Sequence, residues 1–262
     1  MKVEPVNARL HRILSNCRHF WLGYGQATDD LTDARGLTVY RSGIASAMYN
    51  GVLCISPGTD IGGAYDEATR KLAAVPSVWW VGPDSDTGTA EYLCSKGLSS
   101  FAAMTVMEID LASMGPADIP TGISVHRVEG LRDIAAWVRA YTPSFGLSPD
   151  VADAVIERYR VRPEAPGVLE RFEARDGERI VGTSVLLDRD GVAGVYVVTT
   201  AEEYRGRGLG TALTTEALTR AREKGLRVGT LQTSTARSMY ERMGFQAVAE
   251  YKVFTGLGAA GR

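Results

Sequence analysis

The residues of this chain with the clearest chemical potential lie in the stretch Tyr204 to Thr211, "YRGRGLGT". Three glycines alternate there with two arginines, and an amphipathic helical pattern follows at once. Glycine lets a backbone take unusual dihedrals and approach a ligand closely, so that successive N–H groups can point at one anion. The helix N-terminus adds about half a positive charge, and arginine binds phosphate oxygens bidentately. The stretch therefore predicts a site for a pyrophosphate or an equally anionic group.

The spacing of the glycines separates this turn from two other phosphate-binding motifs. It reads G-x-G-x-G rather than the G-x-G-x-x-G of dinucleotide folds, and it follows predicted antiparallel hairpins. It also lacks the G-x-x-x-x-G-K-[ST] pattern of nucleotide triphosphatases. The remaining alternative is a tight turn that needs glycine only for its shape. A bare turn does not explain two arginines beside three glycines.

The elements that must position this turn are predictable from about Gly122 onward. Alternating residues predict a strand at 123–128, and apolar residues at helical spacing predict helices at 131–141 and 149–160. Strands are expected at 168–174, 179–187 and 192–199, joined by the hairpin turns Asp176-Gly177 and Asp190-Gly191. The strand at 192–199 is apolar on both faces, which predicts a central place in the sheet.

The turn is followed by a helix with one apolar stripe, and Gly225 is its predicted C-terminal stop. A strand "RVGTLQT", a short helix ended by Gly244 and a final strand "FQAVAEYKVF" complete this half. The pattern predicts an α/β fold with a mixed sheet.

The first half of the chain contains a weaker copy of the same pattern. "GTAEYLCSKGLSSFAAMTVM" echoes "STARSMYERMGFQAVAEYKVF", and "YDEATRKLAAVPSVWWV" parallels the helix and strand before the second copy. The counterpart of the glycine-arginine turn, "GTDIGGAY", has no arginine. With "ASMGPADIPTG" as the linker, we expect two tandem related domains at 1–115 and 122–262, the first without the distinctive chemistry.

Composition narrows the class of protein. The chain has 262 residues, 45% of them hydrophobic, and a net charge of −2, which gives no electrostatic case for nucleic acid or an anionic membrane surface. No stretch reaches the roughly 18 apolar residues that a membrane helix needs. Three scattered cysteines without a histidine cluster indicate reduced thiols and predict no metal site. We expect a cytoplasmic protein, monomeric or homodimeric.

Two segments of the C-terminal half resemble the Gcn5-related N-acetyltransferases (GNAT). "RGRGLG" fits the R/Q-x-x-G-x-G/A signature of that family, with Arg205, Gly208 and Gly210 at the defining positions, and "MYERMGF" is similar to its second landmark. The resemblance covers about residues 122–254, and the first half is similar to the degenerate copies of tandem members.

The resemblance implies acetyl-coenzyme A, or another acyl-coenzyme A, as the cofactor. Main-chain groups of Val197 and Val198 would pair with the pantetheine arm where their strand splays from the next one. The pyrophosphate would be bound by the turn, for which the expected residues are Arg205, Gly206, Arg207, Gly208, Leu209, Gly210 and Thr211.

The resemblance further implies that Tyr240 is the general acid that protonates the leaving thiolate. Tyr240 also lies on the apolar face of its helix, so core packing is the alternative. A backbone N–H at the end of the 192–199 strand would polarise the carbonyl. The central strand lacks the carboxylate that many members use as general base, which leaves Glu173 or a water held by Tyr196 as candidates. Thr233 stands where the family often has an asparagine.

The predicted reaction is transfer of acetyl to the amine of a small molecule by direct attack in a ternary complex. The acceptor is expected to meet Tyr141, Phe145, Glu173 and Tyr196, and the first domain would help to form its pocket. Two other functions remain open. One is acetylation of protein lysines or N-termini, which an open peptide groove would favour. The other is non-catalytic sensing of acyl-coenzyme A, which the presence of both the turn and Tyr240 disfavours.

Overall fold

The computed structural model describes residues 6–25, 36–116, 118–161 and 167–256. These residues form two compact units. Unit 1 contains the described residues of 1–17 together with 107–247, and unit 2 contains 18–106 and the described residues from 248 on. The two related domains at 1–115 and 122–262 stay a prediction, and the compact units exchange short segments across that boundary.

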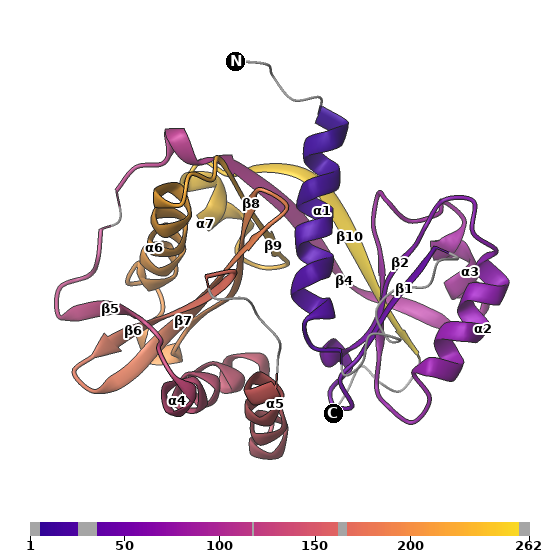
Figure 1. Cartoon of the computed structure of the whole chain (residues 1–262), viewed down its shortest axis with the longest axis horizontal. Coiled ribbons are helices and arrows are strands. Elements are labelled where there is room, and N and C mark those ends of the chain that lie inside the picture. Colours follow the sequence, from indigo (N-terminus) through magenta and orange to yellow (C-terminus); the bar gives the residue numbers. More distant parts are fainter. Residues whose placement is uncertain (1–5, 26–35, 117, 162–166, 257–262) are drawn as a thin grey trace. The chain divides into compact units, whose positions relative to one another are not determined.

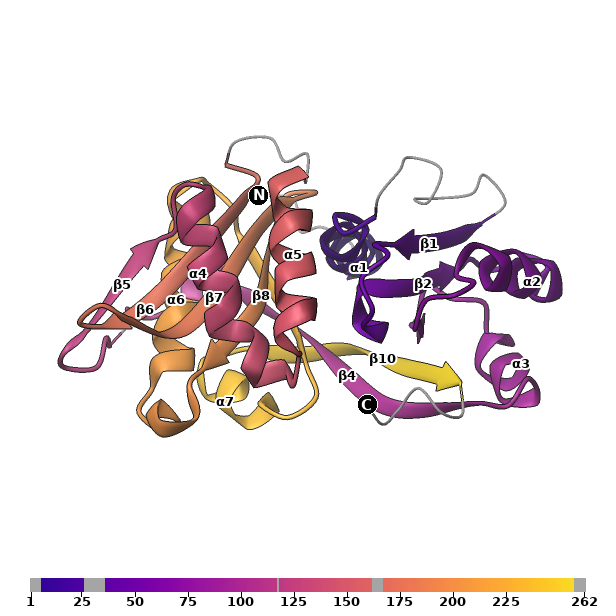
Figure 2. The ribbon, with the colours of Figure 1, turned by 90° about the horizontal axis from the view of Figure 1, so that it is seen from below.

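Unit 1 is a mixed sheet covered on both faces by helices (Figures 1 and 2). Its strands are β5 (Ile123–Arg127), β6 (Leu169–Asp176), β7 (Arg179–Arg189), β8 (Val192–Thr200), β9 (Val228–Thr233) and the end of β4 (Leu98–Asp110). Helices α4 (Leu131–Tyr141) and α5 (Pro149–Val161) lie on one face and α6 (Leu209–Glu223) on the other, with α7 (Arg237–Arg242) after β9. Short 3-10 helices are η3 (Leu111–Ser113), η4 (Thr142–Phe145) and η5 (Glu202–Tyr204).

The strand order in this unit is β4-β9-β8-β7-β6-β5. Strands β5 to β8 pair antiparallel, whereas β8 and β9 pair parallel. Both predicted hairpin turns are confirmed: Gly177 has φ +57°, and Asp190 and Gly191 have φ +57° and +70°. The central place predicted for the strand at 192–199 is confirmed as well, since β8 lies between β7 and β9.

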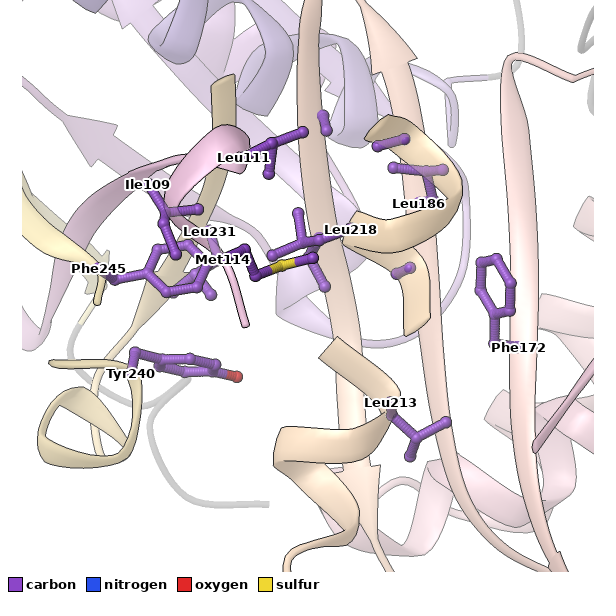
Figure 3. Packing of buried hydrophobic residues seen from close by; sticks show 14 of the residues in the cluster. Ile109, Leu111, Met114, Phe172, Leu186, Leu213, Leu218, Leu231, Tyr240 and Phe245 are labelled. Carbon is purple, nitrogen blue, oxygen red and sulfur yellow. The ribbon is translucent and has the colours of Figure 1, made fainter. Parts of the chain in front are cut away.

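Helix α6 supplies the largest share of the unit 1 core. Its apolar stripe packs on β6, β7 and β8 around Phe172, Leu186 and Val195. Figure 3 shows Leu213 and Leu218 of this helix in the same cluster as Phe172 and Leu186. The helix ends at Glu223, and Gly225 follows with φ +87°, as the sequence predicts. The core thus holds the N-terminus of α6 in a fixed place at the end of β8.

Unit 2 is a smaller sheet with the order β1-β2-β3-β10-β4. Its elements are β1 (Leu37–Arg41), η2 (Ala47–Tyr49), β2 (Asn50–Ile55), α2 (Ile61–Lys71), β3 (Val78–Val81), α3 (Thr89–Ser95), most of β4, and the end of β10 (Gln246–Gly256). Helix α1 (Val6–Leu22) begins in unit 1 and ends in unit 2, and the sequence pattern did not predict it. No helix in the described part of the chain has the length and apolar character to cross a bilayer.

The internal repeat is visible in the element order. The series β2-α2-β3-α3-β4 and β8-α6-β9-α7-β10 correspond, and β2/β3 and β8/β9 are both parallel pairs. The last strand of each series completes the other unit, because β10 pairs with β3 in unit 2 and β4 lies beside β9 in unit 1.

Candidate active site

The glycine-arginine turn connects η5 to α6 at the end of β8. Gly206 and Gly208 have φ of +75° and +85°, a region that side chains with a Cβ rarely adopt. Gly208 is the residue that precedes the helix. Arg205 and Arg207 are exposed, and the Arg207 guanidinium lies 5.0 Å from the centre of the Tyr204 ring. Both cations are therefore accessible to an anion at the turn.

The backbone N–H groups of this turn are not used by the described protein atoms. From Gly206 to Thr211 no N–H has a hydrogen-bond acceptor in the described part of the chain, and the first such bond is from Ala212 N to Gly208 O, 2.9 Å. The first turn of any helix leaves such donors, and here no side chain caps them. A row of free donors beside two arginines suits an anion, and the anion site that the sequence predicts stays a prediction.

Strands β8 and β9 form a fork that opens toward this turn. Their parallel pairing ends at Gly194↔Thr230, although β8 continues to Thr200. Beyond that pair, β8 has a bulge against β7, where Val197 has φ +51° and its carbonyl accepts a hydrogen bond from Thr183 Oγ1 at 2.9 Å. Positive φ at a β-branched residue is strained, and such strain concentrates at functional sites. Because the pairing of β8 with β9 ends at Gly194, Val197 and Val198 have no partner residue on β9 in the described part of the sheet.

Helix α7 brings the second landmark beside the first. A Cβ at Gly210 would lie 3.4 Å from Met239 Sδ, so α7 packs against the first turn of α6. The ring of Tyr240 lies next to that of Phe245 (Figure 3), with centroids 5.6 Å apart. Only 5% of Tyr240 is exposed. Burial raises the pKa of Tyr240 to about 12, partly offset by a hydrogen bond with Thr214. The hydroxyl is thus protonated at neutral pH.

These parts fit an elongated ligand with an anionic head. At about 3.3 Å per residue, the β8 stretch from Gly194 to Thr200 spans about 20 Å between the end of the fork and the turn. Free N–H donors and arginines lie at one end, and unpaired strand edges lead inward. The donor set matches coenzyme A, whose pyrophosphate would lie on the turn and whose thiol arm would lie in the fork.

The residues expected to meet the acceptor do not form one group. Tyr141 is 1% exposed and packs on Trp137, and its ring also meets that of the 55% exposed Phe145, with centroids 5.9 Å apart. Glu173 is buried on β6, two strands from β8, and pairs with Arg175 Nε at 2.5 Å. Two strand spacings are about 10 Å, which separates Glu173 from the fork. Tyr196 alone lies at the fork itself.

Two residues near the fork carry no signal in the sequence. Asn16 of α1 is fully buried and accepts a hydrogen bond from the Tyr196 hydroxyl at 2.6 Å. Gln232 lies on β9 just past the last pair of the fork. Asn16 belongs to a helix that the sequence did not predict, and a lone glutamine in a strand has no motif. Thr233 has a local role, because its Oγ1 accepts the N–H of Ala236 at the start of α7.

The corresponding turn of unit 2 is filled by the protein's own carboxylates. Asp60 precedes α2 and accepts the N–H of Gly62 at 3.1 Å, and Asp86 accepts those of Gly58 and Gly88 at 2.9 and 3.0 Å. These bonds, first from Gly88 and then from Gly58, lower the pKa of Asp86. Negative side chains thus lie where unit 1 presents free donors. No cluster of metal-ligating side chains occurs among the described residues of either unit.

Known proteins resemble this chain in sequence pattern and in fold. Residues 170–247 match the family model described as "Acetyltransferase (GNAT) domain". Among solved structures, a GCN5-related N-acetyltransferase from Kribbella flavida superposes with a TM-score of 0.71 at 18% identity, over 94% of this chain and 96% of that one. A tandem GNAT protein from the clavulanic acid biosynthesis pathway superposes with a TM-score of 0.59 at 16% identity, over 86% and 79%. At these identities the likeness concerns the fold.

Curated relatives are similar over part of their length. A mycothiol acetyltransferase of Streptomyces griseus is 31% identical over 201 residues, which are 72% of this chain and 63% of that protein. A mycothiol acetyltransferase of Thermobispora bispora is 30% identical over 163 residues, 57% and 55% of the two chains. The matched region thus spans between about half and two thirds of these relatives.

Proposed function

We propose that this chain, a member of the Gcn5-related N-acetyltransferase superfamily, transfers an acetyl group from acetyl-coenzyme A to the amine of a small molecule. The observation that carries the proposal is the row of free N–H groups from Gly206 to Thr211, which lies at the open end of the β8–β9 fork and beside Tyr240. An anion-binding turn alone would suit many ligands. Together with an open strand fork it suits an extended arm with a phosphorylated head.

Different parts of unit 1 bind the cofactor and transfer the proton. The turn and its two arginines bind the pyrophosphate, and main-chain groups at Val197 and Val198 pair with the pantetheine arm. Acetyl-coenzyme A supplies a thioester that a neutral amine can attack, with C–N bond formation and loss of the thiolate. Tyr240 donates its proton to that thiolate and regains one from water, and the proton of the amine leaves to solvent.

The small-molecule acceptor is favoured over a protein by the relatives. Proteins named mycothiol acetyltransferases are the curated relatives that match this chain, and we therefore expect mycothiol-related amines to be acceptors to test first. Because the matched region is only part of those proteins, the acceptor of this chain belongs to the proposal.

The test is a panel of acceptors assayed by thiol release from acetyl-coenzyme A. The panel contains a mycothiol-related amine, glucosamine, ethanolamine, spermidine and a lysine-containing peptide. We expect turnover with a small amine and little with the peptide. Preference for the peptide would support a protein acetyltransferase, and tight coenzyme binding without turnover of any amine would support an acyl-coenzyme A sensor.

A further inference from the structure

The end of the β8–β9 fork contains a buried polar cluster that the reaction above does not use. Its members are Asn16 of α1, Tyr196 of β8 and Gln232 of β9, all within unit 1. We infer that Gln232 donates a hydrogen bond to the acyl carbonyl oxygen of the bound thioester. Asn16 is the positioning residue, which acts through Tyr196 to fix the β8 side of the fork. The inference rests on the proposed cofactor and adds an acyl-recognition group to the site.

The orientation of Asn16 is fixed by the backbone around it. Its Nδ2 faces the carbonyl oxygens of Leu187, Arg189 and Val192 at 3.3, 3.1 and 2.9 Å. Carbonyl oxygens only accept hydrogen bonds, so the amide nitrogen must point toward them and Oδ1 must point away. Tyr196 is therefore the donor in the 2.6 Å bond to Asn16 Oδ1. The hydroxyl proton of Tyr196 is therefore used in this bond, and the lone pairs of the Tyr196 oxygen can accept hydrogen bonds from the rest of the cluster.

Gly194 makes this contact possible. A Cβ at Gly194 would lie 2.0 Å from Asn16 Oδ1 and 2.5 Å from Tyr196 Cε2, closer than atoms can approach. Only glycine at this position lets the α1 side chain reach the sheet at the last pair of the fork. The contact of α1 with β8 and the position of the Tyr196 ring therefore both depend on glycine at the point where β8 and β9 separate.

Gln232 is the corresponding residue on the other strand. Gly194 pairs with Thr230, and Tyr196 and Gln232 each follow two residues later, so their side chains leave the same face of the sheet on opposite sides of the fork. Burial raises the pKa of Tyr196 well above its ordinary value, with a smaller contribution from Cys17, and the Gln232 amide partly offsets that rise. Gln232 therefore faces the tyrosine oxygen.

The Gln232 amide nitrogen has unused donor capacity. Nε2 is buried and carries two N–H groups: one is directed toward the Tyr196 oxygen without forming a hydrogen bond of normal geometry, and the other has no acceptor among the described residues. A buried donor without an acceptor is costly, which makes it a ready partner for an acceptor on a ligand. An acyl carbonyl oxygen is such an acceptor, whereas free coenzyme A ends there in a thiol. The cluster should consequently distinguish acetyl-coenzyme A from coenzyme A.

The test compares the two affinities by calorimetry, without an amine and without turnover. Gln232→Met keeps the length of the side chain and removes the donor. We expect the ratio of acetyl-coenzyme A to coenzyme A affinity to fall about three- to tenfold, while coenzyme A affinity stays constant. Gln246→Met, at an exposed glutamine of β10, is the matched control and should leave the ratio unchanged.

A double-mutant cycle tests the role of Asn16. Tyr196→Phe and Asn16→Ala should each lower the same ratio, and Asn16→Ala should have no further effect in the Tyr196→Phe background. Tyr40→Phe removes a buried hydroxyl of unit 2, bonded to Met48 O at 2.7 Å, and controls for the loss of a hydroxyl alone. If Asn16→Ala does not fold, the affinity ratios of Gln232→Met and Tyr196→Phe test the inference.

Each outcome has one meaning. An unchanged ratio in Gln232→Met overturns the inference, and independent, additive effects of Asn16 and Tyr196 overturn the positioning role. A lowered ratio in a protein that acetylates no amine supports the inference and contradicts the proposed acceptor reaction. If the wild-type protein binds neither coenzyme, both proposals fail.

Discussion

At the scale of single residues, Gly208 combines two requirements. Its φ of +85° strains any residue with a Cβ, and a side chain at this position before α6 would project into the open space at the free N–H donors of the turn, where the phosphate is expected. Replacement by valine should weaken coenzyme A binding at least about tenfold, which is about 1.4 kcal/mol. Calorimetry on the folded variant measures this directly.

The matched control for that change lies at the other end of the same helix. Gly225 has φ +87°, and a Cβ there would meet nothing within 4 Å, as at Gly208. Gly225→Val should cost similar folding stability and leave coenzyme A affinity unchanged. Equal affinity losses in the two variants would show that strain, rather than the phosphate site, explains the result.

Tyr240 offers a second test at this scale. With a pKa of about 12 the hydroxyl stays protonated through the neutral range, so it is available as a proton donor. Tyr240→Phe keeps the ring contact with Phe245 and should lower turnover about 10²-fold, the low end for general acid catalysis, because a thiolate is a good leaving group. Coenzyme A affinity and Tm should change little.

If Tyr240 has only a packing role, the expected effects of its replacement are different. If the residue only fills the core, Tyr240→Phe should keep wild-type turnover, and Tyr240→Ala should destabilise the protein by about 3 to 5 kcal/mol through lost packing. Wild-type turnover in the Phe variant would leave protonation of the thiolate to solvent.

At the scale of elements, an ion-pair network ties β5 and β6 to α6. Glu170 of β6, with a side chain 5% exposed, contacts Arg127 of β5 at 3.3 Å and Arg220 and Lys224 at the end of α6 at 3.1 and 3.4 Å. Burial raises the pKa of Glu170, but hydrogen bonds from Arg220 and Arg127 and the nearby positive charges outweigh it, so the pKa is lowered. The network fixes the C-terminal end of the helix whose N-terminus forms the turn.

Glu170→Gln should lower the free energy of unfolding by about 1 to 2 kcal/mol, because it removes the charge of a buried carboxylate whose cationic partners are partly exposed to solvent. In the wild type this contribution is present above the pKa of an unfolded glutamate and is lost as pH falls through the lower, folded pKa. Urea unfolding at neutral and acidic pH measures both effects. Glu223→Gln removes an exposed partner of Arg220 and should stay within about 0.5 kcal/mol, and an equal effect of the two changes would contradict the role given to burial.

At the scale of the whole molecule, the two copies of the repeat differ in what fills their turns. Unit 1 has free donors and two arginines, and unit 2 has Asp60 and Asp86 on its donors. Titration should therefore give about one coenzyme A per chain, and Gly208→Val should remove that one site. A stoichiometry of two, or one site insensitive to Gly208→Val, would contradict the assignment of binding to unit 1 alone.

The sequence by itself determined the local elements of the C-terminal half and the glycine-arginine turn. The shape of this turn depends on adjacent backbone, so the turn at residues 205–211 was predictable from residue types alone, and the hairpin turns were predictable for the same reason. Helix α1 was missed, and Asn16 with it, although its amphipathic character is no weaker than that of α5 or α6. Only the tertiary structure decided the rest: the exchange of β4 and β10 between units, the strained Val197, the separation of Glu173 from the fork, and the meeting of Asn16, Tyr196 and Gln232. Each of these depends on contacts between residues far apart in the chain, whose pairing is set by packing and by hydrogen-bond geometry that no local pattern encodes.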